Sequence, residues 1–305
     1  MDRQRDVLVE PPPAADRESR GIVVGVDGTA ANWSAVSWAA AEARATGRPL
    51  RLVAAMSTDA PASVPLTETP DRAHVERQTR ELLDGVSSRL GGASRHVFTQ
   101  VSTGEPAQAL VAATAPDDLL VVGKRGGHSL SRMVLGSTSM AVAGRCRGPL
   151  VVVPEGWSVG QHVDDPITVG IDEERDPRVL DFAFLRAQRL GVPLVVVHAS
   201  YPSVRHPASS RKASRGSDEA LSELAGVVAP WQQRHPSVSV RLATYALTPT
   251  VALLGAATDA QLLVVGRHLG PHDLGGLGPG STPRKVLHHA PCPVAVVPQA
   301  FPSHR

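Results

Sequence analysis

Short runs of apolar residues recur along this chain, separated by longer stretches in which apolar positions lie three or four residues apart. Runs that are apolar at every position predict strands of a parallel sheet that is covered on both faces. Ala35, Ala39 and Ala43 illustrate the other spacing, which predicts one buried face of a helix. The predicted strands are 22–26, 50–55, 97–101, 119–122 and 150–153, then 167–171, 194–199, 238–243, 262–265 and 294–297.

The two halves of the chain repeat this pattern in the same order. Residues 21–27 correspond to 167–172, and 47–55 correspond to 191–199. Each unit of about 145 residues is long enough to bury its own core. We therefore expect two tandem doubly wound α/β domains, each a Rossmann-like, five-stranded parallel sheet with strand order 3-2-1-4-5. The expected divisions are a disordered leader 1–20, a first domain 21–155, a linker 156–166, a second domain 167–299 and a tail 300–305.

The fifth strand of each expected domain lies at a sheet edge, yet it is apolar along its length. Soluble proteins rarely leave such an edge uncovered. We therefore expect residues 150–153 and 294–297 to face each other in an internal pseudo-twofold pair. A homodimer of the whole chain through strand edges stays open.

A glycine pattern follows the fourth strand of each half. Glycines let a backbone curve closely around an anion, and the N–H groups that begin a helix point at it. In the expected strand order the first pattern meets Asp27, which ends the first strand, at the crevice where the order reverses. The pattern therefore predicts a nucleotide site. Its residues are Val122, Gly123, Lys124, Arg125 and Gly126, then Gly136, Ser137 and Thr138 after nine further residues.

The second copy of the glycine pattern is altered. Three residues separate Gly266 from Gly270, where the first copy has two between its glycines. The extra residue shifts N–H groups that must converge on a phosphate, and Glu173 with Glu174 adds negative charge near the crevice. We expect the first site to bind its ligand more tightly than the second.

Charge and cysteine content exclude several classes of function. Lys and Arg number 31 against 29 for Asp and Glu, a formal charge of +2 that is too balanced for a nucleic-acid-binding surface. Cys146 and Cys292 stand at different places in the two halves, so neither a disulfide framework nor a metal site is expected. We see no membrane-length apolar run or signal peptide, and expect a cytoplasmic protein without membrane partners.

Three features together resemble the universal stress protein family in its tandem two-domain form. They are the Val-Gly-Val-Asp-Gly start at 24–28, the Gly-x2-Gly-x9-Gly-Ser spacing at 123–137 and the closing apolar segment at 148–154. The similarity covers 21–154 and 167–299. It implies the adenine nucleotide alpha hydrolase-like form of the fold and a regulatory stress-response role. It also implies ATP as ligand, with or without Mg²⁺, and a pseudo-dimer inside the chain.

The resemblance also implies which residues contact the nucleotide. The aspartate after the first strand meets the adenosine side, backbone after the second strand meets adenine, and the glycine loop and helix start hold the phosphates. In the first domain these are Asp27, Ala55, Val122, Gly123, Gly126, Gly136, Ser137 and Thr138, with Lys124 and Arg125 placed to screen phosphate charge. In the second they are Asp172, Ala199, Val265, Gly266, Gly270, Gly280, Ser281 and Thr282.

Other interpretations stay open. Gly123 and Gly126 fit turns with positive φ, Ser137 and Ser281 fit helix N-caps, and Asp27 and Asp172 fit the same capping role. The chain has no Gly-x4-Gly-Lys-Ser/Thr loop and no paired nucleophile and base, which favours regulation by binding over turnover. The alternatives are a nucleotide-processing enzyme, acting as a slow ATP hydrolase or adenylyl transferase, and an interaction scaffold that binds no nucleotide.

Overall fold

The computed structural model describes residues 21–56, 72–91, 96–124, 136–172, 177–199, 217–267 and 280–298. Three residues predicted for the two sites lie outside these ranges: Arg125, Gly126 and Gly270. The expected leader 1–20, the tail 300–305 and the Glu173–Glu174 pair also lie outside them.

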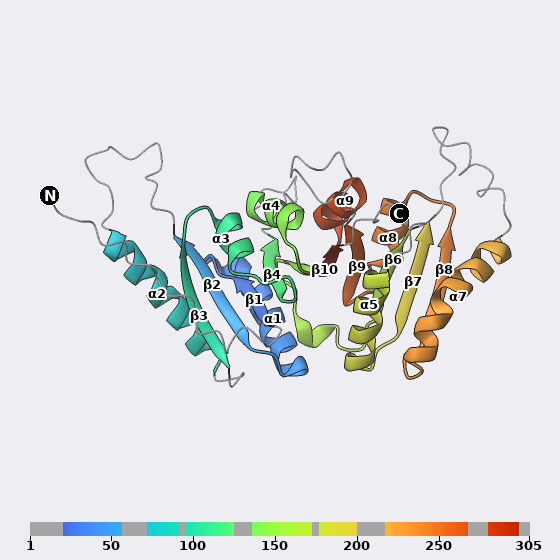
Figure 1. Ribbon diagram of the computed structural model, residues 1–305, viewed down its shortest axis with the longest axis horizontal. Helices are drawn as coiled ribbons and strands as arrows, with labels where there is room; N and C mark the ends of the chain where they lie inside the picture. The colour runs from blue at the N-terminus through green and yellow to red at the C-terminus, as the bar shows by residue number, and fades with distance from the viewer. Residues whose placement is uncertain are drawn as a thin grey trace, which may run out of the picture.

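A single ten-stranded sheet runs through the molecule (Figure 1). The first repeat contributes β1 (Ile22–Gly25), β2 (Leu50–Met56), β3 (Val97–Thr103), β4 (Leu119–Lys124) and β5 (Leu150–Pro154). The second contributes β6 (Ile167–Ile171), β7 (Leu194–Ala199), β8 (Val240–Tyr245), β9 (Leu262–Arg267) and β10 (Val294–Pro298). The strand order is β3-β2-β1-β4-β5-β10-β9-β6-β7-β8. The predicted order 3-2-1-4-5 is confirmed, and the two parallel sheets join into one.

The junction between the repeats is the antiparallel pair of β5 and β10. Val151 faces Ala295, and Leu150 and Val152 face Val296 and Val294 in turn. Val151 and Ala295 occupy the same position in their repeats, so a pseudo-twofold axis passes between them. The expectation that these two apolar edges face each other is confirmed. Because both edges are used within the chain, the sheet ends in β3 and β8.

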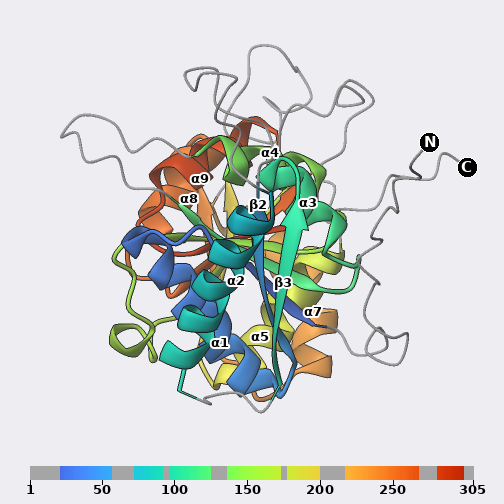
Figure 2. The same cartoon turned by 90° about the vertical axis from the view of Figure 1, so that its left-hand side faces the viewer.

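Helices cover both faces of the sheet. The first repeat has α1 (Trp33–Thr46), α2 (Arg72–Arg89), α3 (Pro106–Ala112) and α4 (Ser137–Arg145), and the second has α5 (Pro177–Leu190), α7 (Ser217–Arg234), α8 (Pro249–Ala256) and α9 (Ser281–His289). Residues of α1, α2, α5 and α7 share one buried apolar core, and residues of α3, α4, α8 and α9 share the other. Each core continues through both repeats. Figure 2 shows α2 and β3 at one end of the molecule.

Helices α1 and α5 illustrate how sequence sets these elements. Ala35, Ala39 and Ala43 are buried as their spacing predicts. Gly47 follows α1 in the left-handed region at φ 66°, and its N–H bonds to the carbonyl of Ala43. Gly191 follows α5 at φ 68°. A glycine adopts this conformation without strain, and it therefore ends both helices at the same point of the repeat.

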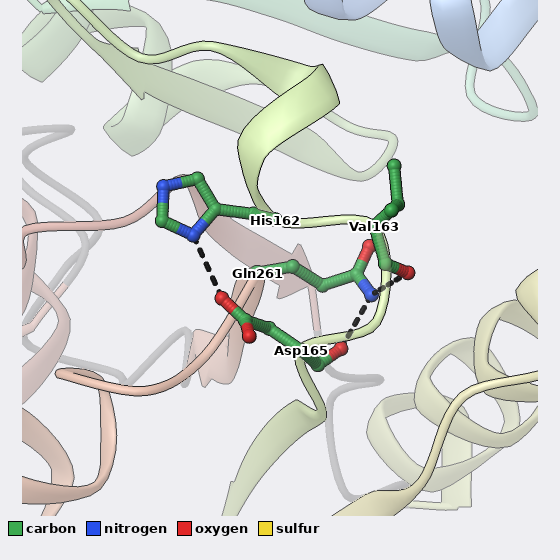
Figure 3. A network of polar contacts seen from close by, with 4 residues as sticks. All are labelled: His162, Val163, Asp165 and Gln261. Carbon is green, nitrogen blue, oxygen red and sulfur yellow. Dashed lines mark hydrogen bonds and ion pairs between the residues drawn. The ribbon is translucent and has the colours of Figure 1, made fainter.

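The segment 156–166 between the repeats contains the short 3₁₀ helix η3 (Val159–Gln161) and is tied to the second repeat. Figure 3 shows that the Gln261 amide donates to the carbonyls of Val163 and Asp165. The ring of His162 contacts the Asp165 carboxylate at 2.7 Å. These contacts fix the start of β6 against the start of β9.

Candidate functional site

Asp27 lies just beyond the end of β1, with an exposed side chain. Its Oδ1 accepts hydrogen bonds from the backbone N–H of Thr29 at 2.9 Å and from the Thr29 hydroxyl at 2.7 Å. Gly28 between them has φ 75°, which favours glycine. Asp27 therefore holds the turn after β1, while the N-cap position of α1 is taken by Asn32, in the 3₁₀ helix η2 (Ala30–Asn32).

Asn32 organises this end of the sheet, and sequence reasoning missed it. Its amide nitrogen donates to the carbonyl of Gly25 at 3.0 Å, and its amide oxygen accepts from the N–H of Asp27 at 3.4 Å. A Cβ at Gly123 would lie 3.3 Å from the same amide nitrogen. Gly123 is not among the glycines with positive φ, so the turn interpretation of this residue is wrong. A larger residue would be crowded there, because β4 closely approaches Asn32.

Helix α4 begins above the end of β4. The Ser139 hydroxyl donates to the carbonyl of Gly123 at 2.9 Å and joins the two elements. The N-cap is Gly136, and Ser137 is the first helical residue. In α9 the N-cap is likewise Gly280 rather than Ser281, so the interpretation of the two serines as N-caps is wrong. Neither helix has a side-chain hydrogen bond at its cap.

Gly136 has no conformational reason to be glycine. Its φ of −61° and ψ of 151° are ordinary for any residue. A Cβ at this position would meet no atom of the described residues within 4 Å. Among the described residues no side chain caps α4, so the backbone N–H groups of its first turn have no capping partner there. Such groups attract anions.

Lys124 is bound to the other repeat. Its Nζ donates to the carbonyl of His288 in the other repeat at 2.5 Å, and the residue is only 5% exposed. Burial lowers the pKa of Lys124 to about 8. Its ammonium therefore serves the interface between the repeats. Arg267, at the equivalent place in β9, donates to the carbonyls of Ala143 and Cys146 at 2.8 and 2.6 Å.

The other predicted residues of the first site contribute in different ways. The side chain of Val122 is buried in the core, so only its backbone remains for a ligand. Ala55 is half-buried in β2, and Thr138 is half-buried in the first turn of α4. Through Asn32 and Ser139 the structure brings Asp27, Gly123 and the start of α4 to one end of the sheet.

The second site departs from the first in its backbone as well as its sequence. Gly280 has φ 91°, a conformation that favours glycine, whereas Gly136 is extended. Pro283 stands where the first repeat has Ser139, so the hydroxyl bond between strand and helix is lost. His198 Nδ1 contacts the carbonyl of Ile171 at 3.2 Å.

The remaining predicted residues of the second site occupy the places that the first repeat implies. Asp172 and Ala199 are half-buried at the ends of β6 and β7, and Val265 is buried. Gly266 lies within β9, and Ser281 and Thr282 begin α9. The two predicted sites therefore have the same arrangement of residues on their strands and differ at the helix start.

Neither cysteine forms a disulfide, and both are buried. Burial raises the pKa of the Cys146 thiol, and that of Cys292 to about 12. Among the described residues no three His, Cys, Asp or Glu side chains gather as metal ligands. Within the same ranges, no helix combines the length and apolar character needed to cross a membrane.

Comparisons with known proteins agree with the fold and with the repeat. A universal stress protein of Mycolicibacterium smegmatis is 33% identical over 287 residues, covering 91% of this chain and 96% of its own. One from Mycobacterium tuberculosis is 32% identical, covering 93% and 99%. The crystal structure of a universal stress protein from Archaeoglobus fulgidus superposes with a TM-score of 0.69 at 18% identity, covering 92% of this chain and 96% of that one. The sequence model of the Universal stress protein family matches residues 18–154 and 165–298, and the chain belongs to this family.

Proposed function

We propose that this protein is a cytoplasmic regulatory module of the stress response that binds ATP in its first repeat. The observation that carries the proposal is the start of α4. Gly136 has an ordinary backbone conformation and open space where a Cβ would stand, next to N–H groups without a capping side chain. Neither backbone strain nor packing among the described residues accounts for glycine here. The close approach of a phosphate does account for it.

Other residues of the first repeat fit the rest of an adenine nucleotide. The exposed carboxylate of Asp27 suits the ribose hydroxyls, because it accepts hydrogen bonds and stands at the same end of the sheet. The backbone near Ala55 suits the adenine, since a base edge pairs well with free N–H and C=O groups at a strand end. The phosphates would lie against Gly136, Ser137 and Thr138, with or without Mg²⁺. Lys124 has no place in this arrangement, because its ammonium is bound to His288.

Regulation by occupancy fits this site better than turnover. General base catalysis needs a base within hydrogen-bond reach of the attacking group. The Asp27 carboxylate instead accepts hydrogen bonds from Thr29, and within the described residues the helix start offers only backbone and hydroxyl groups. We therefore propose that bound ATP alters contacts with a protein partner. Where the whole chain forms a homodimer through strand edges, β3 and β8 are the edges left for it.

The test is mass spectrometry of the nucleotide released when the purified chain is denatured, with its stoichiometry. We expect one adenine nucleotide per chain. The stripped protein is then titrated with ATP by calorimetry, and its ATP hydrolysis is measured in the same buffer. Binding with turnover slower than about one per minute supports regulation, since typical enzymes turn over at 1–10³ per second. Absence of binding would favour the scaffold alternative, and fast turnover the enzyme.

A further inference from the structure

Glu42 of α1 and Arg186 of α5 form an ion pair between the two repeats. Their side chains are 7% and 11% exposed, so the pair is buried in the interface. The Arg186 guanidinium also lies over the ring of Trp38, at 4.6 Å from its centroid. An acid and a base buried together in this way are costly to separate, since either one alone would be an unpaired buried charge.

Glu42 and Arg186 occupy the same position of the repeat. Helices α1 and α5 are both 14 residues long, and each is followed by a glycine with φ near 67°, at 66° and 68°. Glu42 is the tenth residue of α1, and Arg186 is the tenth residue of α5. The two helices pack on β5 and β10, where Val151 and Ala295 mark the pseudo-twofold axis. The axis therefore passes between two equivalent residues of opposite charge.

Two other parts of the interface do not distinguish one repeat from the other. Apolar strands face each other across β5 and β10. Lys124 and Arg267 are both cations, and each binds carbonyls at the end of a helix in the other repeat. Two copies of the first repeat could reproduce these contacts, and so could two copies of the second. At the axis, however, two first repeats would place Glu42 against Glu42, and two second repeats would place Arg186 against Arg186.

We propose that Glu42 and Arg186 act as a pairing code, so that this interface accepts a first repeat with a second repeat and rejects two alike. Like charges in a buried site cost several kcal/mol at typical interfaces, which is how repulsion gives specificity. The partner that fits each half is the complementary half, in the same chain or in a second copy that exchanges halves with it. Duplication permits this code, because a single-domain homodimer must place identical residues at its axis.

The test uses four full-length variants. Glu42→Arg and Arg186→Glu each place like charges at the axis, and we expect each to lower Tm by about 10 °C. The double variant restores opposite charges, and its Tm should return to within about 3 °C of the parent. The matched control is Arg80→Glu, which places like charges in the exposed pair Arg80–Glu76 on α2 and should change Tm by less than about 2 °C.

The pairing code also predicts exchange between chains. When Glu42→Arg and Arg186→Glu chains are unfolded and refolded together, each first repeat finds an oppositely charged second repeat in the other chain. Native mass spectrometry of the mixture should then show a heterodimer, whereas each variant refolded by itself should show no dimer. Where a single variant is insoluble, co-expression of the two should recover both chains in a soluble heterodimer. A double variant no more stable than the summed single effects, or a mixture without heterodimer, would overturn the proposal.

Discussion

The Nζ of Lys124 lies 2.5 Å from the carbonyl oxygen of His288, and the two residues belong to different repeats. Arg267 makes the equivalent contact in the other direction, with the carbonyls of Ala143 and Cys146. Each cation thus stands at the C-terminal end of a helix, where unpaired carbonyls and the helix dipole favour positive charge. The last residue of β4 holds α9, and the last residue of β9 holds α4.

Replacing Lys124 by methionine should therefore destabilise the chain. Met has a similar length and leaves the His288 carbonyl without its donor, so at pH 9.5, where the buried lysine is largely neutral, we expect the free energy of unfolding to fall by about 1–3 kcal/mol. Urea unfolding followed by circular dichroism measures the change. Lys285→Met is the matched control, since Lys285 is exposed on α9, and should change stability by less than about 0.5 kcal/mol. Equal losses in the two variants would contradict an interface role for Lys124.

The contribution of Lys124 should also depend on pH. Its pKa is about 8 in the folded protein against 10.5 for an ordinary lysine. Below pH 8 the side chain is protonated in both states, and the cost of burying its charge is fully present. Between pH 8 and 10.5 the unfolded chain binds more protons, so folding gains stability as pH rises. The gain is at most about 1.4 kcal/mol per pH unit for one proton.

The measurement is the difference in unfolding free energy between the parent and Lys124→Met at pH 7.5, 8.5 and 9.5. The Cys292 thiol acts in the opposite sense, because its pKa is raised to about 12 and its stabilisation is lost as pH rises above 9. Lys124 and Cys292 interact electrostatically, but with its pKa at about 12 the thiol stays protonated in the folded protein up to pH 9.5, so the difference reports on Lys124. We expect the difference to increase with pH. A constant or falling difference would show that the lysine is not desolvated as the structure implies.

Much of the fold follows from local pattern. Apolar runs and their repetition predicted the strands, because a parallel strand buried on both faces leaves a distinctive sequence. The strand order was the one expected for the doubly wound fold class that these strands indicate. The apolar edges of β5 and β10 predicted the junction, since an exposed apolar edge is unstable in water. These predictions needed no knowledge of which side chains meet.

The role of Lys124, by contrast, could be found only by knowing which side chains meet in the folded protein. Its place beside Gly123 suggests a phosphate contact, but successive side chains of a strand point to opposite faces. Lys124 therefore shares its face with Val122, and α9 of the other repeat covers that face. The role of Glu42 could have been predicted from the sequence, because it is an acid beside the apolar face of α1 and its equivalent in the second repeat is Arg186. Comparing charges between repeats would have indicated the pair.

Placing a charge in the strand junction should separate or unfold the repeats. Val152 and Val296 are both 2% exposed in the central strands. An aspartate there would be a buried charge without a partner, which costs far more than the loss of a valine side chain. For Val152→Asp we expect a loss of more than about 4 kcal/mol, or failure to fold. An unchanged melting temperature and hydrodynamic radius would contradict the junction between β5 and β10.

Gly136→Val should abolish binding at the first site and leave stability within about 1 kcal/mol of the parent. The valine conformation is compatible with φ −61° and ψ 151°, and its side chain would fill the space that the phosphate needs. Gly148→Ala gives the contrast, because a Cβ there would lie 2.6 Å from the carbonyl oxygen of Pro116. That variant should lose about 1–3 kcal/mol and retain nucleotide. Unchanged ATP affinity in Gly136→Val would show that this glycine has no ligand role.

The two aspartates test which repeat binds ATP more tightly. Asp27→Ala in the full chain should remove the tight site, whereas Asp172→Ala should leave it. The reason is the backbone at the helix start, which is extended at Gly136 in the first repeat and has φ 91° at the equivalent Gly280 in the second.

Asp27 also holds the turn through Thr29, so loss of binding in the alanine variant has two explanations. Asp27→Asn separates them, since its side-chain oxygen can still accept from Thr29 while the negative charge is gone. Calorimetric titration should show full affinity in Asp172→Ala, and a loss of at least about tenfold, or 1.4 kcal/mol, in both Asp27 variants if the carboxylate contacts the ribose. Wild-type affinity in Asp27→Asn would assign Asp27 to the turn alone, and loss of the tight site in Asp172→Ala would place that site in the second repeat.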